Sequence, residues 1–523
     1  MRRRWAFVVG LAVALPLAVV PSTGAAPTGV DALKVDLDDI LADPRLGGAQ
    51  AGVAVRDPAT DEVLYSRQAT DRATPASNAK LFTAAAALET LGPDHRFRTQ
   101  VLSDAAQQGS TLNGDLHLRG TGDPTMLPAD YDALAARLAE QGVREVRGRL
   151  LADDTSFDDV PLGTGWAWDD EPYSYSAPVS ALSAAPDTDF DAGSAIVRVT
   201  PTAPGQAPDV ALDPGTGVLD VDNRATTVAE GEPSIGITRD HHSGRVLVTG
   251  TVPAGTEPVR EWIAVPDATA YATDLFARAL AARGITVNGT GKAPAPEGAR
   301  ELAARDSMPL RELLVPFLKL SNNVHAEVLV KAMGRERAGE GTWEAGTGVV
   351  ADALRGLGVD PAALRLVDGS GLSRMDGVTP DQLALLLDNA AQRPWAQAFH
   401  DALPIAGVPE RMVGGTLRDR MVDTPAANNV HAKTGSLTGV TSLSGYVTAA
   451  DGRRLVFSVV LNDFLSDAPQ DLEDAIAIRL AQHTGADDHP RGHARIPQPR
   501  TGSDDPGTAR DESALECSWT KSC

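Results

Sequence analysis

Residues 73–92 read ATPASNAKLFTAAAALETLG, a stretch that places a serine and a lysine at the start of an alanine-rich run. Thr74 and Pro75 precede the run and Gly92 follows it, so the pattern predicts a helix. Ser77 and Lys80 are three residues apart and would share one face of that helix. Only 7 of the 47 basic residues in this chain of 523 are lysines. A lysine beside a serine therefore suggests that an amine is needed here.

A serine and a lysine on one helix face can act together in nucleophilic catalysis. A serine hydroxyl is a weak nucleophile that needs an adjacent base. Lysine can be that base if burial lowers its pKa, whereas arginine stays protonated. The positive end of the helix dipole near Ser77 would favour negative charge on its oxygen. The S-x-x-K pattern alone also fits a solvated lysine on a helix, so it does not decide between these interpretations.

Two further stretches strengthen the catalytic interpretation. KLSNNVHAEVLVKAMG, residues 319–334, places Ser321 at the expected start of a helix and Asn323 two residues later. The stretch HAKTGSLTGV, residues 431–440, predicts an edge strand that contains Lys433, Thr434 and Gly435. Taken separately, Ser321 could be an N-cap and Lys433 an edge-strand charge. Together with the first pair, they form three motifs in a fixed order.

The segments that carry these motifs predict one α+β compartment. Residues 50–66 indicate two strands around an Asp-Pro turn, and a second hairpin is expected through Asp451-Gly452. Helices are expected at 31–43, 308–319, 321–334, 344–357, 380–392 and 470–484. Residues 27–95 and 300–486 would then form an antiparallel sheet with helices on its faces.

Residues 96–299 differ from these flanks. Short strands alternate with turns rich in Gly and Pro, and helical patterns occur only near 128–142 and 268–284. We interpret this region as a large, mostly β insertion made of two subdomains, one nested in the other.

The two ends of the chain have their own signatures. Arg2 to Arg4, an apolar stretch from Trp5 to Val20 and small residues after it are typical of a signal peptide over residues 1–26. The apolar stretch is shorter than the roughly 20 residues that span a bilayer. Residues 487–523 are polar and rich in Pro and Gly, which predicts a disordered tail. The tail holds both cysteines, Cys517 and Cys523, so any disulfide between them would be local.

The charge and the histidines exclude several classes of function. A net charge of −23 argues against binding to nucleic acid or to anionic lipid. The adjacent His241 and His242 lack metal-ligand spacing and a third ligand, and no H-E-x-x-H motif occurs. The sequence therefore predicts no metal and no other cofactor.

The motif order resembles a known family. S-x-x-K at Ser77, S-x-N at Ser321 and K-T-G at Lys433 form the three-motif set of penicillin-binding proteins and serine β-lactamases. The long insertion after the first motif is similar to that of the class C low-molecular-mass penicillin-binding proteins, the D-alanyl-D-alanine carboxypeptidase/endopeptidase family S13. Two further stretches support the resemblance, GDLHLRGTGDPTM at 114–126 and DGSGLSRMDGVTP at 368–380. It covers roughly residues 30–485.

The resemblance implies a role for each motif residue. Ser77 would be the acylated nucleophile, Lys80 its general base and Ser321 a proton relay to the leaving group. Asn323 would bind the substrate backbone and orient Lys80, and Lys433 would supply positive charge. The carboxylate of the substrate would be bound by the hydroxyl groups of Thr434 and Ser436 on the strand that contains Gly435. The oxyanion hole would consist of the backbone N–H groups of Ser77 and Ser436. Position 436 is a serine where the resemblance leads us to expect threonine more often.

The resemblance also implies a substrate and a location. The substrate would be a peptidoglycan stem peptide ending in D-Ala-D-Ala, or a D-Ala-linked crosslink between two stems, cleaved outside the cytoplasmic membrane, whether extracellular or in the cell wall. β-Lactam antibiotics would acylate Ser77. The balance between carboxypeptidase and endopeptidase action, and the oligomeric state, are left open.

Two alternatives compete with this prediction. A serine β-lactamase would share the motifs, but the insertion of about 200 residues and the absence of a Glu-x-x-x-Asn element between the first two motifs argue against it. A non-catalytic wall-binding protein would share the fold, but the motif residues are intact.

Overall fold

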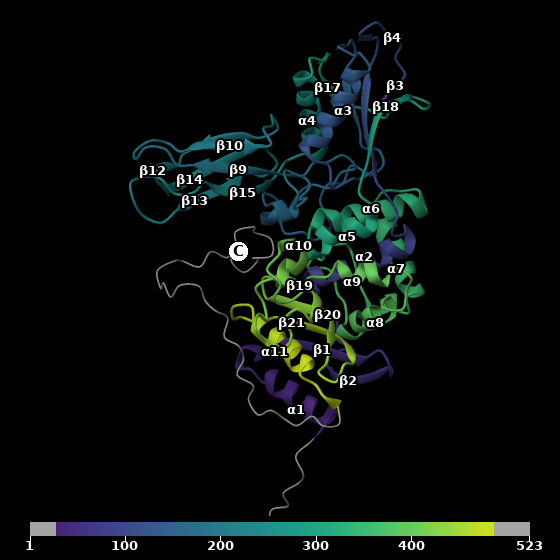
Figure 1. Ribbon diagram of the computed structural model, residues 1–523, viewed down its shortest axis with the longest axis vertical. Coiled ribbons are helices and arrows are strands. Elements are labelled where there is room, and N and C mark those ends of the chain that lie inside the picture. The colour runs from purple at the N-terminus through teal and green to yellow at the C-terminus, as the bar shows by residue number, and fades with distance from the viewer. Residues whose placement is uncertain (1–27, 486–523) are drawn as a thin grey trace, which may run out of the picture.

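The computed structural model describes residues 28–485, and its lower part in Figure 1 is built on a five-stranded antiparallel sheet. The strand order is β19-β20-β21-β1-β2. The strands are β1 (Gln50–Asp57), β2 (Glu62–Arg67), β19 (His431–Leu437), β20 (Val440–Thr448) and β21 (Arg454–Asn462). The N-terminal hairpin thus joins the C-terminal strands through the pairing of β1 with β21. This pairing brings residues far apart in the sequence into one sheet and leaves β19 at its edge.

Helices cover both faces of this sheet. On one face lie α1 (Val30–Ile40) and α11 (Gln470–Ala481), and on the other lie α2 (Ala79–Thr90) and α8 (Pro380–Ala390). Central strand β20 is buried along almost its whole length because both of its faces are covered. α8 begins where the Thr379 hydroxyl caps the backbone N–H of Gln382 and proline occupies the first turn.

A layer of helices lies between the sheet and the insertion in Figure 1. It contains α5 (Leu310–Lys319), α6 (Asn323–Ala338), α7 (Trp343–Gly356), α9 (Ala396–Asp401) and α10 (Arg411–Gly414). Short 3-10 turns elsewhere in the described chain are Pro44–Leu46, Ala76–Asn78, Trp168–Asp170, Ser174–Ser176, Pro361–Ala363 and Gly415–Leu417. The alanines of α2 give it a slim surface, so α6 and α7 pack closely against it.

The insertion begins with a second five-stranded sheet of order β17-β8-β6-β3-β18. Its strands are β3 (Arg98–Ser103), β6 (Leu116–Gly120), β8 (Leu150–Asp153), β17 (Thr290–Lys292) and β18 (Arg300–Asp306). The helices α3 (Pro128–Glu140) and α4 (Ala268–Ala282) pack with it in one hydrophobic core. A small sheet adds β4 (Gln107–Gln108), β5 (Thr111–Leu112), β7 (Glu145–Val146) and β16 (Thr286–Val287). Because β18 pairs with β3, the five-stranded sheet extends to Asp306, beyond the end of the insertion that was expected at residue 299.

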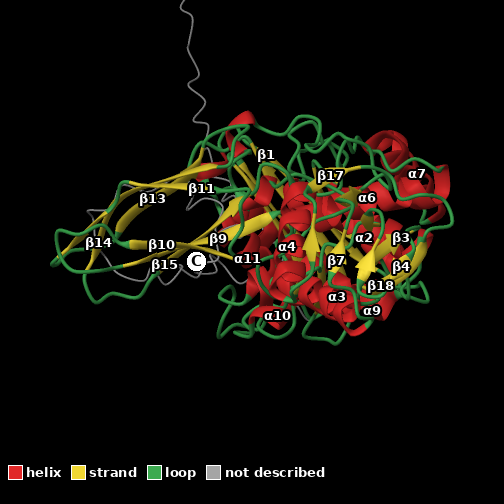
Figure 2. Ribbon diagram, turned by 90° about the horizontal axis from the view of Figure 1, so that it is seen from above, coloured by secondary structure: helices red, strands yellow, loops and turns green. Residues whose placement is uncertain are grey.

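A second set of strands projects from the insertion as an arm, at the left of Figures 1 and 2. One sheet contains β9 (Ser194–Thr200), β10 (Asp209–Asp213) and β15 (Val259–Ala264). The other contains β11 (Asp220–Asn223), β12 (Thr226–Val228), β13 (Ser234–Arg239) and β14 (Arg245–Pro253). All these strands lie between β8 and α4 in the sequence.

The expected elements agree with the structure, with one instructive difference. The predicted helix at 321–334 begins only at Asn323, and its N-cap is Asn322. Ser321 precedes this N-cap and has a φ of 63°, a left-handed conformation, so the alternative interpretation of Ser321 as an N-cap is wrong. Within residues 28–485, no helix is long and apolar enough to cross a membrane. The expected signal peptide, the tail and both cysteines lie outside the described residues.

Candidate active site

Ser77 and Lys80 meet at the entry to α2. Ser77 lies in the 3-10 turn Ala76–Asn78, and Lys80 lies in the first turn of α2. The Lys80 ammonium donates to Ser77 Oγ over 2.8 Å. Ala76, directly before the serine, has a φ of 47°, which is a strained conformation for a residue with a side chain. The pair that shares a helix face in the sequence is therefore a hydrogen-bonded pair in a sharp turn.

Lys80 is completely buried, and its amine has three acceptors. Besides Ser77 Oγ, they are Asn323 Oδ1 at 2.6 Å and the carbonyl oxygen of Ser370 at 2.8 Å. Burial lowers the pKa of Lys80 to about 7, although the negative charges of Glu327 and Asp368 act in the opposite direction. At neutral pH a large fraction of the amine is therefore unprotonated and can accept the proton of Ser77.

Ser321 and Lys433 form a second hydrogen-bonded pair. The Lys433 amine donates to Ser321 Oγ and to the Thr434 carbonyl, both over 2.8 Å. Burial, followed by the positive charge of Lys80, lowers the pKa of Lys433 well below its usual value. The left-handed turn at Ser321 directs its side chain toward β19 instead of leaving it on the surface of α6. Both pairs consist of a serine hydroxyl and a buried lysine.

The edge strand β19 lies against the turn that contains Ser77. The Asn78 side chain joins them, because its amide donates to the Lys433 carbonyl over 3.2 Å and to Ser442 Oγ over 2.6 Å. A Cβ at Gly435 would overlap Ser442 Oγ and lie 3.0 Å from the backbone nitrogen of Ser77. Glycine is therefore required at the third position of the K-T-G motif for the strand to approach Ser77 this closely.

The two hydroxyl groups at the end of this motif are held in place by neighbours. Thr434 Oγ1 donates to the Thr416 hydroxyl over 2.8 Å, and Gln470 Nε2 donates to Ser436 Oγ over 3.5 Å. Both Thr434 and Ser436 are largely buried yet retain some exposure, at 6% and 7%. They therefore lie at the boundary between the protein interior and the surface.

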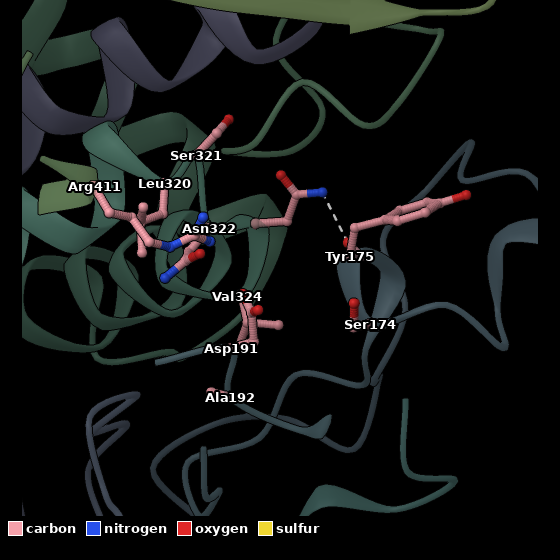
Figure 3. A pocket seen from close by; sticks show the side chains of 10 residues that line it. Ser174, Tyr175, Asp191, Ala192, Leu320, Ser321, Asn322, Val324 and Arg411 are labelled. Atoms are coloured by element: carbon pink, nitrogen blue, oxygen red, sulfur yellow. Dashed lines mark hydrogen bonds between the residues drawn. The ribbon is translucent and has the colours of Figure 1, made fainter. Parts of the chain in front are cut away.

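Asn323 connects the lysine to the insertion. Its Oδ1 accepts from Lys80, and its Nδ2 donates to the Tyr175 carbonyl over 2.8 Å, the bond drawn in Figure 3.

A pocket opens beside Ser321, with Ser174 and Tyr175 on one side and Leu320, Asn322 and Arg411 on the other (Figure 3). Its remaining lining residues are Asp191, Ala192, Ser321, Asn323 and Val324.

The structure thus brings together all the residues predicted for the site. Ser77, Lys80 and Asn323 are joined by direct hydrogen bonds, as are Ser321 and Lys433. The cluster is completed by the neighbouring strand residues Thr434, Gly435 and Ser436. No sequence pattern pointed to Asn78 or Thr416, because their side chains contact residues distant in the chain, Lys433 and Thr434.

The stretch DGSGLS, residues 368–373, forms a wall of the site. Its Ser370 carbonyl accepts from Lys80, and Gly371, with a φ of 80°, lies directly against the backbone of Ala76. Asp368 accepts from Trp166 Nε1 over 2.9 Å and from two backbone N–H groups of its own loop. The repeated glycines in this stretch were the visible sign of this close approach.

The histidines that were considered for metal binding have another role. His241 Nδ1 lies 2.8 Å from Glu171 Oε2, and its ring stacks on that of Trp168 at 3.8 Å between centroids. In the part of the chain from 28 to 485, no group of three or more His, Cys, Asp or Glu side chains is arranged to hold a metal ion.

Comparisons with known proteins agree with this geometry. The family model of the D-Ala-D-Ala carboxypeptidase 3 (S13) family matches residues 33–483. The D-alanyl-D-alanine carboxypeptidase of Actinomadura sp. (strain R39) is 46% identical over 523 aligned residues, which cover 98% of this chain and 95% of that protein.

Solved structures show the same fold. The crystal structure of penicillin binding protein 4 (DacB) from Haemophilus influenzae has a TM-score of 0.74 and 27% identity, and the match covers 85% of this chain and 98% of that one. A second structure of that protein, complexed with a novel β-lactam, has a TM-score of 0.69 and 26% identity, with the same coverage. The predicted α+β architecture and the predicted family are both confirmed. This chain belongs to the D-Ala-D-Ala carboxypeptidase 3 (S13) family.

Proposed function

We propose that the protein is an exported serine peptidase that removes the terminal D-alanine from peptidoglycan stem peptides through an acyl-enzyme on Ser77. The observation that carries this proposal is the 2.8 Å hydrogen bond between Ser77 Oγ and the buried amine of Lys80. A lysine with a pKa of about 7 is matched to the task of a general base at neutral pH. Membership of the S13 family supports the choice of substrate.

Acylation begins when Ser77 Oγ attacks the carbonyl carbon of the penultimate D-alanine. Lys80 takes the proton of the hydroxyl group, and the carbonyl oxygen becomes an oxyanion. Backbone N–H groups of Ser77 and Ser436 stabilise that oxyanion, which is the kind of interaction that contributes most to such reactions. The close approach of β19 to the Ser77 turn, which Gly435 allows because it has no side chain, supports this placement of the two N–H groups.

The peptide bond breaks when its nitrogen receives a proton. Ser321 Oγ donates that proton and is resupplied with the proton that Lys80 took from Ser77, so Lys80 is unprotonated again for the next step. The amine of Lys433 lies 2.8 Å from Ser321 Oγ and supports this relay. Free D-alanine leaves, and the rest of the stem peptide remains as an ester on Ser77. Water then attacks the ester while Lys80 accepts a proton from it, and Ser77 recovers its proton as the acid is released.

Substrate recognition would use the polar groups around the nucleophile. The Thr434 and Ser436 hydroxyl groups bind the terminal carboxylate, with Lys433 supplying positive charge nearby. Asn323 binds the backbone of the stem peptide while its Oδ1 continues to orient Lys80, an assignment supported by the 2.6 Å bond between them.

Three related properties belong to the same proposal. β-Lactams acylate Ser77 as mimics of the substrate, which is supported by the β-lactam complex of the Haemophilus influenzae relative. An amine from a crosslinked neighbouring stem can leave in place of D-alanine, which would give endopeptidase activity. The signal peptide predicted over residues 1–26 would deliver the enzyme to this substrate outside the cytoplasmic membrane.

The test combines intact mass with product analysis. The protein is incubated with penicillin, and D-alanine release from a D-Ala-D-Ala peptide is followed separately. The expected result is one stable penicillin adduct on Ser77, D-alanine release, and neither in the Ser77→Ala variant. Absence of both in the unsubstituted protein would refute the proposal. Rapid loss of penicillin without a lasting adduct would identify a β-lactamase instead.

A crosslinked stem-peptide dimer tests the endopeptidase part. Conversion of the dimer to monomers, absent in Ser77→Ala, is expected. The N-terminal residue of the protein recovered from the culture tests export, because cleavage near Ala25 or Ala26 is expected.

A further inference from the structure

Glu327 is a completely buried acid one turn along α6 from Asn323, and the proposed chemistry does not use it. Its two carboxylate oxygens accept hydrogen bonds from three N–H groups, and the Ser370 side chain adds a hydrogen bond that lowers the pKa of Glu327. Oε1 accepts from the backbone of Ser370 over 2.8 Å. Oε2 accepts from the backbone of Gly369 over 2.9 Å and from Trp343 Nε1 over 2.7 Å. A buried carboxylate with this many partners is expected to hold a specific structure in place.

The segment that it holds is the one that holds the catalytic lysine. The carbonyl of Ser370 accepts from the Lys80 amine over 2.8 Å, and the carbonyl of Gly369 accepts from Thr83 Oγ1 over 2.7 Å. Both Lys80 and Thr83 lie on α2. Residues 369–370 therefore bridge two helices: Glu327 on α6 binds their N–H groups, and α2 binds their carbonyl groups.

We propose that Glu327 is a positioning residue for catalysis, which fixes residues 369–370 so that the Ser370 carbonyl keeps the Lys80 amine directed at Ser77. This inference rests on the proposed function, because it assigns Lys80 as the base for Ser77. Glu327 has no hydrogen bond to Ser77 or Ser321 and does not contact the substrate. It acts only through residues 369–370 and through its charge.

Three N–H donors require an acceptor-only group, which a carboxylate is and a glutamine side chain is not. A glutamine at this position would turn its NH₂ group toward at least one N–H donor and leave that donor without a partner. Glu327→Gln is nearly the same size as the native residue. It therefore disturbs the polar contacts without creating a cavity.

The charge of Glu327 also acts on the base. Together with Asp368 it raises the pKa of Lys80 against the effect of burial. The other ionisable groups that sense Glu327 are Lys331 on the same helix and Asp376 on the loop side. Burial and the charge of Asp368 raise the pKa of Glu327 itself to about 7, while its hydrogen bonds lower it.

The far side of Glu327 is connected to the insertion. Trp343, which donates to Glu327, has the Lys331 amine over its ring at 3.7 Å from the centroid. The same amine donates to Asp158 over 2.6 Å and to the Val160 carbonyl over 2.7 Å, both in the insertion. These contacts fix the Trp343 ring and hence the orientation of the carboxylate.

The experiment measures the rate constant for penicillin acylation of Ser77, per folded molecule, from pH 5 to 9. The variants are Glu327→Gln, Trp343→Phe and the matched control Glu473→Gln. Glu473 is an equally buried glutamate with hydrogen bonds to Arg420 and Thr441, but α11 lies on the opposite face of the sheet from α2. Thermal unfolding reports the structural cost of each substitution.

For Glu327→Gln, two changes are expected. The rate constant at its high-pH plateau falls by at least about tenfold, because at least one of the N–H groups that bind Glu327 loses its acceptor, which loosens residues 369–370 around the Lys80 amine. The acid limb moves to lower pH by less than about one unit, because Glu327, which is only partly charged in this pH range, no longer raises the pKa of Lys80. Trp343→Phe keeps the charge, so its plateau falls about fivefold, as for one lost hydrogen bond, while its acid limb stays in place. Glu473→Gln lowers the unfolding temperature and changes neither kinetic quantity.

The inference is overturned if Glu327→Gln folds and acylates within about twofold of the unsubstituted protein at every pH, or if Glu473→Gln produces the same kinetic changes. If Glu327→Gln does not fold, an unchanged plateau for Trp343→Phe overturns it. Failure of the unsubstituted protein to form a Ser77 adduct refutes the proposed function, and this inference with it. A Ser77 adduct accompanied by an unaltered Glu327→Gln variant refutes the inference alone.

Discussion

The rate of Ser77 acylation should follow the ionisation of Lys80, and pH is the simplest perturbation that tests this. Only the unprotonated amine can accept the proton of Ser77, so the rate must rise with pH through the pKa of Lys80. With a pKa of about 7, about nine in ten amines are neutral at pH 8 and about one in a hundred at pH 5. The rate constant should therefore fall about ninetyfold between these two values.

A solvent-exposed lysine would give a different dependence of the acylation rate on pH. A lysine at the usual value of 10.5 would be neutral in only about one molecule in three thousand at pH 7. Its acylation rate would keep rising tenfold for each pH unit up to about pH 10. The buried lysine should instead give a plateau above about pH 8.

The assay is the appearance of the penicillin adduct by intact mass after acid quenching, with circular dichroism at each pH to confirm that the protein is folded. Lys80→Arg serves as the matched variant, because arginine keeps the positive charge but does not lose its proton. It should show no adduct at any pH in this range. A rate that is flat from pH 5 to 8, or one that rises without a plateau to pH 10, would show that Lys80 is not the base we describe.

Three substitutions test the packing around the nucleophile. Gly371→Ala would place a Cβ against the Ala76 carbonyl at a φ of 80°, so acylation should fall at least about tenfold; Gly92→Ala, with a φ of 87° and open space around it, is the control and should cost only about 1 kcal/mol of stability. Gly435→Ala should push β19 away from Ser77 and abolish labelling by a fluorescent penicillin while the circular dichroism spectrum is retained; full labelling would contradict the close approach. Asn78→Ala should lower the free energy of unfolding by about 2 kcal/mol in urea titration, because a buried side chain that joins the Ser77 turn to β19 is removed; a stability equal to that of the unsubstituted protein would show that this link is unimportant.

Much of the architecture could be predicted from local patterns. The hairpin through Asp451-Gly452 forms where a turn dipeptide separates two apolar runs, and α2 forms where alanines follow Thr74-Pro75. The start of α6 was placed wrongly because Ser321 carries a good N-cap side chain. In the structure Ser321 has a left-handed backbone, which serine seldom adopts, and accepts a hydrogen bond from Lys433 on β19.

The order of the motifs was in the sequence, whereas their geometry was not. Residue types and spacing determined the reactive pair Ser77 and Lys80, because a helix brings residues three apart onto one face whatever its surroundings. The low pKa of Lys80 depends on its burial. The segments packed around its amine include α6 and the DGSGLS loop, whose acceptors lie 243 and 290 residues away in the chain. Such contacts arise only when the pairing of β1 with β21 joins the two ends of the catalytic region, because desolvation is a property of the packed structure and not of the local chain.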